Sequence, residues 1–232
     1  FQEHKQQYQT ALYAPMKALS EELTEAFAQT EGLKMHLSRI YRDMRMHPPV
    51  PYKESLWMCL RRDGGSWLEH PCLFFELTSE GYSYGFLLWG PKAEAMNRYR
   101  EQLCDRKEEF LKLAKAVERQ TGLTISGQRY ARPKPCPDPR LEPYYSLKNL
   151  FAISEHPVDD ALFSPDLGRQ VRDTLLALLP TARFWASLLG SMARILGGFF
   201  LAAALGTLLA ALAARFKRVE EWLAPPVLAM KT

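Results

Sequence analysis

The sequence predicts an α+β fold, in which an antiparallel sheet packs with helices, followed by a C-terminal hydrophobic helix. Three observations support this class. Helical apolar periodicity and short aromatic-rich runs occupy separate blocks of the chain, a turn sequence joins two of the runs, and a charge-free stretch lies near the end. Because helices and strands that occur in blocks favour an antiparallel sheet, we expect α+β topology.

The first expected element is an amphipathic helix over residues 3–29. Its apolar residues recur every three or four positions, as in Tyr8, Leu12, Met16, Leu19 and Leu23, which is the spacing of one helix face. Pro15 lacks a backbone donor and clashes with the preceding turn, so the helix should kink there or divide into two. Gly32 is expected to end the segment.

Aromatic-rich runs predict the strands of the sheet. Residues 55–60, 72–77 and 82–89 are short and rich in aromatic side chains. A Ser-Glu-Gly sequence at 79–81 separates the last two runs, which indicates a hairpin turn. Residues 144–153 have the same character and predict one more strand.

Two helical regions complete the domain. The first opens at Pro91 and ends at Gly122, and the second covers residues 166–179 and is expected to stop before Pro180. Between them, the proline-rich segment 132–143 is too interrupted for a helix or a central strand, so we expect a loop.

The tail differs in character from the rest of the chain. Residues 195–214 carry no charge and lie between Arg194 and Arg215, and this length suits a helix that crosses a bilayer. We therefore expect an α+β domain over residues 1–185, and an apolar tail over 186–232 with a transmembrane helix at 195–214. A buried core helix and a frame-shifted, alanine-rich translation are the alternatives. The domain itself is expected in the cytoplasm, anchored to a membrane if the tail crosses one.

Composition excludes several functional classes. The net charge of +4 over 232 residues is far below that of typical nucleic-acid-binding domains, so no specific nucleic-acid partner is predicted. The four cysteines and five histidines show no metal-site spacing. Phosphate-binding loops and the serine-hydrolase and zinc-protease motifs do not occur. We predict no metal and no cofactor, and the sequence leaves open whether the protein is an enzyme.

A basic cluster is the strongest candidate site. Arg39, Arg42 and Arg45 recur every third residue around Asp43. Guanidinium groups repel one another unless an anion lies among them, and each grips a phosphate or carboxylate with two hydrogen bonds. In a helix the three could converge on one anion, whereas in an extended segment Arg42 would point away from the other two. Periodicity does not choose between these conformations.

Other polar residues could complete an oxyanion pocket for a small anionic ligand. Asp43 could orient one guanidinium, in which case its pKa would be depressed. Tyr52 and Lys53 follow a proline-broken loop, and Lys148 lies among aromatic residues. In an enzyme, Tyr52 or Lys53 would donate the proton while the arginines stabilise developing charge. The alternative is a non-catalytic interaction module in which the arginines form a structural lattice of salt bridges.

The basic cluster resembles the signature of a known family. That signature, R-x-x-R-D-x-R-F-x-x-x-[D/N]-K-x-x-Y, belongs to DUF2461, a widespread bacterial family of unknown function. The matching residues are Arg39, Arg42, Asp43, Arg45, Pro51, Tyr52 and Lys53. The resemblance implies the fold and the site, but it implies no activity because the family has none established.

The resemblance covers most of the chain, from Phe1 to about Trp185, and it implies that an N-terminal helix is missing before Phe1. Two departures stand out. Met46 occupies the place of the usual aromatic residue, and residues 47–50 replace a longer loop that carries an acidic or amide residue and a lysine. A role that requires this lysine is therefore not expected here.

Overall fold

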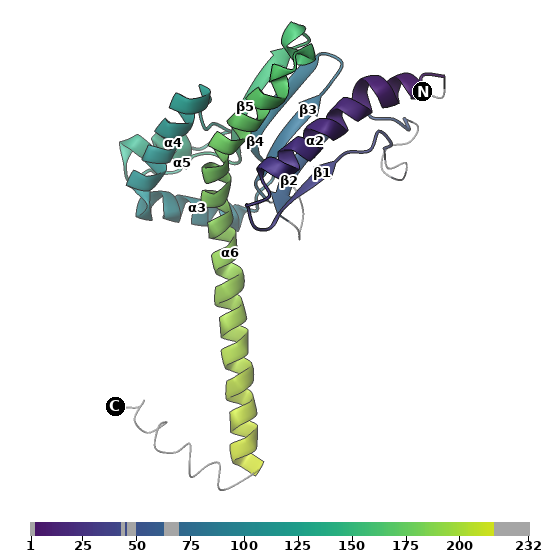
Figure 1. The fold of residues 1–232 in the computed structure, drawn as a ribbon. Coiled ribbons are helices and arrows are strands. Elements are labelled where there is room, and N and C mark those ends of the chain that lie inside the picture. Colours follow the sequence, from purple (N-terminus) through teal and green to yellow (C-terminus); the bar gives the residue numbers. More distant parts are fainter. Residues whose placement is uncertain (1–2, 43–44, 46–49, 63–69, 216–232) are drawn as a thin grey trace. The chain divides into compact units, whose positions relative to one another are not determined.

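The computed structural model describes residues 3–42, 45, 50–62 and 70–215, with the side chains of all of these except 185–200 and 209–215. The chain divides into two compact units, Phe1–Ala186 and Ser187–Thr232. Figure 1 shows the elements of both units.

The described residues of the first unit form a five-stranded sheet with the strand order β1-β2-β3-β4-β5. All neighbouring strands are antiparallel, which confirms the predicted α+β class. The strands are β1 (Leu33–Leu37), β2 (Leu56–Arg62), β3 (Cys72–Leu77), β4 (Gly81–Leu88) and β5 (Leu150–Pro157). The predicted hairpin joins β3 to β4, where the backbone N–H of Thr78 donates to the carbonyl of Gly81 at 2.8 Å.

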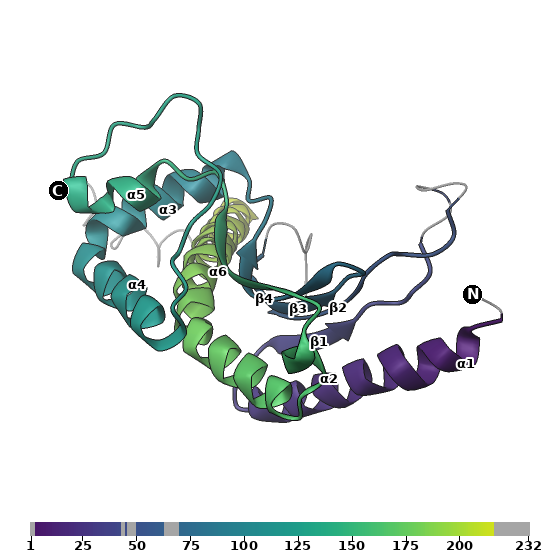
Figure 2. The ribbon, with the colours of Figure 1, turned by 90° about the horizontal axis from the view of Figure 1, so that it is seen from above.

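One face of the sheet is buried beneath helices. Alternate residues on β2, β3 and β4 point to this face, and those of the core are Leu56, Met58, Leu60, Leu73, Phe75, Tyr82, Tyr84, Phe86 and Leu88. Helix α2 (Ala14–Ala26) and the first turns of α6 (Asp166–Arg215) lie on that side (Figure 2). Arg172 Nη1 of α6 lies 3.2 Å from Glu22 Oε1 of α2, so the two helices are neighbours.

The N-terminal helical segment divides near Pro15, as predicted. A short α1 (Lys5–Tyr8) leads into a π-helical turn (Gln9–Tyr13), and α2 follows with Pro15 in its first turn. The π-helical turn lies just before the proline, where the N–H of Ala14 donates to the carbonyl of Gln9 five residues earlier, and such a local irregularity accommodates a residue that lacks a backbone donor. The buried face of α2 is formed by Met16, Ser20 and Leu23.

The predicted helical region from Pro91 to Gly122 consists of two helices, α3 (Ala93–Asp105) and α4 (Lys107–Thr121). Gly122 adopts a left-handed conformation with φ 71° and ends α4, as its position predicts. The ring of Phe110 in α4 packs edge-on against Tyr144 and against Phe184 of α6, with centroids 4.9 and 5.8 Å apart. These helices therefore form a second core beside the sheet.

Two predicted boundaries are wrong. Tyr144 belongs to the short helix α5 (Glu142–Tyr145), and β5 begins only at Leu150. Pro143 lies in the first turn of α5, where its fixed φ favours a helix over a strand. The 132–143 segment also contains a 3-10 turn, Pro139–Leu141.

The second wrong boundary is the expected stop before Pro180, because α6 continues through this residue. Proline removes one helical hydrogen bond. Leu178, Leu179, Ala182 and Phe184 around it are all buried, and their packing offsets the lost bond.

The predicted transmembrane helix at 195–214 falls within α6. The side chains of residues 185–200 and 209–215 lie outside the described part of the chain. Within the part that is described, the structure contains no helix long and apolar enough to cross a membrane. The expectation of a membrane span therefore gains no support from the structure.

Candidate functional site

The candidate site lies on a two-stranded ribbon that continues β1 and β2 beyond the sheet. The backbone N–H of Arg42 donates to the carbonyl of Pro51 at 2.9 Å, and that of Lys53 donates to Ile40 at 2.8 Å. Tyr41 and Tyr52 pair across the ribbon, with ring centroids 5.6 Å apart. The segment that carries Arg39 and Arg42 is therefore extended, which resolves the choice that periodicity left open.

The ribbon is irregular, and this irregularity positions the arginines. Leu37 pairs with Met58, whereas Tyr41 pairs with Tyr52, so four residue steps on one strand oppose six on the other. Such bulges break the alternation of side chains and redirect them. Arg39 and Arg42 consequently line the same depression, although strict alternation would place them on opposite faces.

This depression, which we call the basic depression, is open to solvent and has a volume of about 900 Å³. It lies between the ribbon and the β3–β4 turn. Its basic residues are His36, Arg39, Arg42 and Lys53, its acidic residues are Glu54, Glu76 and Glu80, and its hydroxyl groups come from Tyr41, Ser55, Thr78 and Ser79. The turn is well ordered, because Thr78 Oγ1 accepts from the backbone N–H groups of Glu80 and Gly81 at 3.2 and 3.1 Å.

Burial and neighbouring cations lower the pKa of two groups in the basic depression. Partial burial lowers the pKa of Lys53, and the neighbouring charge of Arg42 lowers it further. Burial also lowers the pKa of His36, with Arg61, Lys53 and Arg39 as the charges that add to the effect. All the charged groups that shift the pKa of Lys53 or His36 are cations, although three glutamates line the same depression.

Trp57 provides an aromatic wall for these groups. Lys53 Nζ lies 5.5 Å from the centroid of the Trp57 ring, and the His36 ring lies 5.4 Å from it. An ammonium group over an indole face is stabilised by the ring quadrupole. The aromatic ring thus holds Lys53 without neutralising its charge.

The structure divides the predicted site. Arg39, Arg42 and Lys53 line the basic depression, whereas Tyr52 packs against Tyr41 and Arg45 is exposed elsewhere on the ribbon. Asp43 lies outside the described residues, as do residues 46–49, where the chain departs from the family signature.

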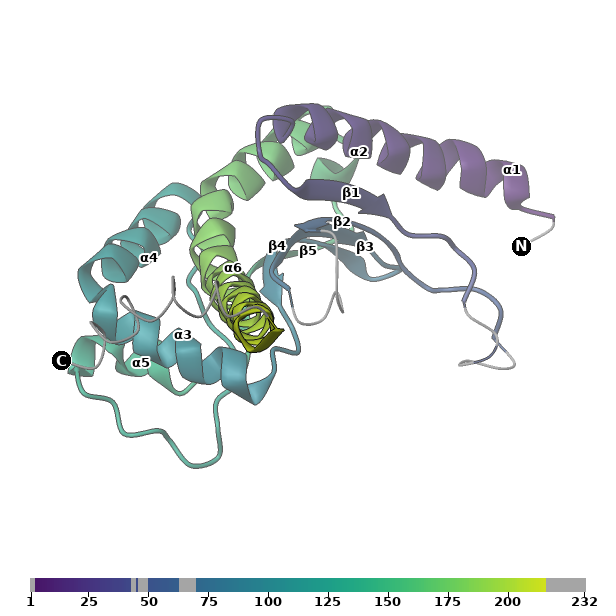
Figure 3. The same cartoon turned by 90° about the horizontal axis from the view of Figure 1, so that it is seen from below.

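Lys148 does not join the basic depression. Its Nζ lies 5.6 Å from the centroid of Tyr130, and the residue follows the end of α5 by three positions. Helices α3, α4 and α5 gather away from β1 and β2 (Figure 3). Glu76 of the depression is in register with Ser83, and Ser83 with Glu155. Lys148 precedes Glu155 by seven residues, which corresponds to roughly 20 Å along a strand.

Lys148 instead belongs to a second group of cations around Tyr130. Arg100 Cζ and Lys134 Nζ lie 5.7 and 5.5 Å from the centroid of the same ring. Arg100 is only 6% exposed, and its Nη1 has no hydrogen-bond partner among the described residues. Backbone bonds fix this arrangement, since the N–H of Lys148 donates to Gln128 at 2.7 Å.

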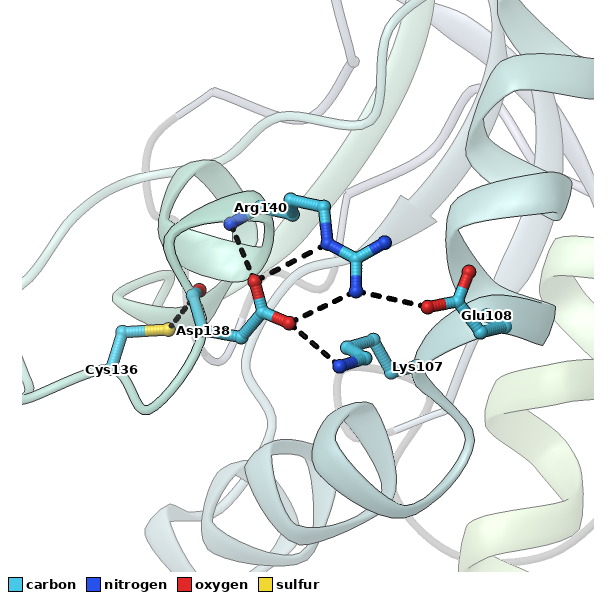
Figure 4. A network of polar contacts seen from close by, with 5 residues as sticks. All are labelled: Lys107, Glu108, Cys136, Asp138 and Arg140. Carbon is cyan, nitrogen blue, oxygen red and sulfur yellow. Dashed lines mark hydrogen bonds and ion pairs between the residues drawn. The ribbon is translucent and has the colours of Figure 1, made fainter.

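A polar network ties the loop that carries Lys134 to the start of α4 (Figure 4). Asp138 Oδ2 lies 2.7 Å from Lys107 Nζ and 3.2 Å from Arg140 Nη2, and Arg140 Nη2 lies 2.9 Å from Glu108 Oε1. Hydrogen bonds from Lys107 and Arg140 hold the pKa of Asp138 well below its usual range. This network is structural, because its charges are paired.

Sequence reasoning missed several residues of the basic depression. His36 arises from β1, a strand that the sequence did not identify, and Glu76 lies in the middle of β3. Only the three-dimensional pairing of β1, β2 and β3 brings these residues beside Arg39. In the described part of the chain, no group of three or more His, Cys, Asp or Glu residues could hold a metal ion.

Residues 1–184 match the model of a protein family described as a conserved hypothetical protein (DUF2461). No curated protein and no solved structure matches the chain.

Proposed function

The chain belongs to the DUF2461 family of conserved hypothetical proteins, and from this premise we propose that its α+β domain binds a small molecule through a phosphate or carboxylate group in the basic depression. Because the family description names no activity, the proposal is built on the geometry and charge of the site.

A single observation carries the proposal. Arg39, Arg42 and Lys53 line one depression, yet among the described residues no carboxylate oxygen lies within 4.0 Å of their basic nitrogens. Unneutralised cations that share a hollow repel one another, and an anion among them relieves this repulsion. Guanidinium groups also match the geometry of phosphate and carboxylate.

The rival explanation is a structural lattice of salt bridges. Elsewhere in the domain such a lattice is visible, as in the network of Asp138 with Lys107 and Arg140. In the basic depression, Glu54, Glu76 and Glu80 are present, but they do not pair with the arginines at salt-bridge distance. This contrast favours a ligand site over a lattice.

If the domain also catalyses a reaction, Lys53 is the better candidate for the proton donor. Its side chain lines the depression and its pKa is lowered, and a donor works best when its pKa lies near the working pH. Tyr52 packs against Tyr41 instead.

Thermal denaturation in the presence of inorganic phosphate, nucleotides and citrate tests the proposal. A ligand that binds only the folded state at a hundred times its Kd stabilises it by about 2.7 kcal/mol, which corresponds to a rise in Tm of roughly 5–10 °C for a domain of this size. Arg42→Ala should weaken binding and so reduce this rise at the same ligand concentration.

Arg169→Ala is the matched control, because Arg169 is exposed on α6 and pairs with Asp166 at 3.1 Å. This variant should keep the ligand-dependent rise. If none of the anions shifts Tm while Arg42→Ala unfolds the domain, the arginines are structural and the proposal is wrong.

A second candidate function is that of an interaction module attached to a lipid surface through the C-terminal unit. Leu201, Leu205 and Leu208 are all exposed in α6, and their spacing places them on one face of the helix. We propose that this face contacts lipid, which Leu205→Asp would weaken. Sedimentation of the full chain with anionic vesicles tests this, and equal sedimentation of both proteins would argue against it.

A further inference from the structure

A second hollow adjoins the basic depression. It has a volume of about 960 Å³ and shares five residues with the depression, namely Lys53, Glu54, Ser55, Thr78 and Ser79. Pockets of this size hold typical small-molecule ligands. The two hollows meet at these shared residues, and a ligand that occupied both would pass from one face of the sheet to the other at this point.

The chemistry of this second hollow differs from that of the basic depression, and we call it the apolar groove. Its three walls come from the N-terminal helical segment up to α2, from the buried face of the sheet, and from the segment between β5 and the first turn of α6. The residues that form the walls include Leu12, Met16, Leu56, Phe75, Val158 and Phe163. The groove therefore offers mainly hydrocarbon surface to a ligand.

Part of the apolar groove is exposed to water. Leu12 is 42% exposed, Val158 50% and Phe163 77%. Single exposed apolar residues are common, but several gathered around one hollow mark a binding surface. An apolar group that occupied the groove would remove these side chains from water, and such burial is favourable.

We propose that the ligand of this domain is an anionic amphiphile, with a carboxylate or phosphate head in the basic depression and an apolar body in the apolar groove. The inference rests on the proposed function and adds the ligand class to it. The head contacts Arg39, Arg42 and Lys53, and the body lies along α2.

Lys53 occupies the junction of the two hollows. It lines both of them, and its aliphatic stem can contact the apolar part of a ligand while the ammonium group meets the head. Its Nζ rests over Trp57 at 5.5 Å, and the backbone bond from Lys53 to Ile40 fixes the residue on the ribbon. Lys53 therefore places a positive charge at the boundary between the basic depression and the apolar groove.

The occupant we infer is a dissolved small molecule rather than a lipid in a bilayer. The apolar groove is a hollow of limited volume bounded by three elements, whereas a bilayer surface would require a protruding apolar surface. A second copy of the chain or a segment of the chain itself would have to place a carboxylate in the basic depression to meet its cations.

Isothermal titration calorimetry of the full chain with straight-chain carboxylates and alkyl phosphates, from two to ten carbons and below their micelle concentrations, tests the inference. Each methylene that enters the groove should lower Kd roughly fourfold. Arg42→Ala should weaken binding at every chain length by a similar factor. Primary alcohols of the same lengths should bind much more weakly than the carboxylates.

Leu12→Asn and Phe163→Ser change exposed groove residues, so both variants should fold. They should flatten the dependence of Kd on chain length and leave the binding of acetate and inorganic phosphate unchanged. Leu176→Asn is the matched control, because Leu176 is exposed on α6 and does not line the groove. This variant should behave as the wild type.

The outcomes separate the two proposals. If no anion of any length binds, the proposed function fails. If short anions bind but added methylenes do not lower Kd, the anion site stands and the amphiphile inference is overturned. The amphiphile inference would also be overturned if carboxylates and phosphates bound only as part of lipid vesicles, or if alcohols bound as tightly as carboxylates. A stable dimer in which a second copy of the chain fills the apolar groove would overturn it as well.

Discussion

Replacing Gly85 by alanine tests the pairing of β4 with β5. Gly85 is directly opposite Ile153 and has a φ of 153°. A Cβ added at this position would lie 2.1 Å from the carbonyl oxygen of Ala152 and 3.0 Å from Cα of Ile153. Both neighbours belong to the backbone, so no side chain can move aside.

The expected cost follows from this geometry. Ordinary contact begins near 3.4 Å, so the two strands must separate by more than 1 Å at this point. The separation weakens the adjacent ladder hydrogen bonds and leaves buried groups poorly paired, at about 1–3 kcal/mol for each group. Together with backbone strain, we expect Gly85→Ala to destabilise the domain by about 4 kcal/mol.

Thermal denaturation followed by circular dichroism measures this effect. For a domain of this size, the expected loss corresponds to a drop in Tm of roughly 8–16 °C. Gly122→Ala is the matched control, because Gly122 has a φ of 71° and nothing lies within 4 Å of the added Cβ. The control carries only conformational strain of about 1–2 kcal/mol. Equal melting temperatures for the two variants would refute the close approach of β4 to β5.

Three further predictions concern charged residues. Anion binding in the basic depression should weaken as pH rises through the pKa of Lys53, which burial and the charge of Arg42 hold below its usual value. In Arg42→Gln, this loss of binding should occur at higher pH. Measurement of Kd between pH 7 and 11 tests this, and the same pH dependence in both proteins would show that the two groups do not interact. Lys148→Ala should leave anion affinity in the basic depression unchanged, because Lys148 lies beside Tyr130, and a tenfold loss of affinity would contradict the division of the predicted site. Asp138 has a depressed pKa, so the stabilisation from its ion pairs is fully present above its usual value of 3.8 and is lost as pH falls below that value and through its folded-state pKa. At pH 7 the network is fully formed, and Asp138→Asn should make the 132–143 loop more sensitive to proteolysis. A variant cleaved at the wild-type rate would show that the network does not hold the loop.

Local patterns were sufficient to predict much of the fold. Residues 72–77 and 82–89 are rich in aromatic residues and flank a turn sequence, and they form β3 and β4 almost as expected. The helix that ends at Gly122 was equally visible, because a left-handed glycine marks the end of a helix. Signals of this kind depend only on residues that are close in sequence.

The elements that were missed depend on distant partners. β1 is a strand because it pairs with β2, more than 20 residues away, and its sequence alone fits a helix face as well. Pro180 does not end α6 because buried residues on both sides hold the helix in place. In each case tertiary packing outweighs the local preference.

The sequence by itself determined the fold class and the family resemblance, and it indicated Arg39, Arg42 and Lys53 as candidates for a site, because the chemistry of a guanidinium cluster is visible without coordinates. Only the tertiary structure decided which residues share a site. A bulge in the ribbon turns Arg39 and Arg42 into one depression, strand pairing adds His36 and Glu76, and the length of β5 keeps Lys148 far away. The physical reason is that chemical character belongs to single residues, whereas proximity is set by hydrogen-bond register and packing between segments that are distant in the chain.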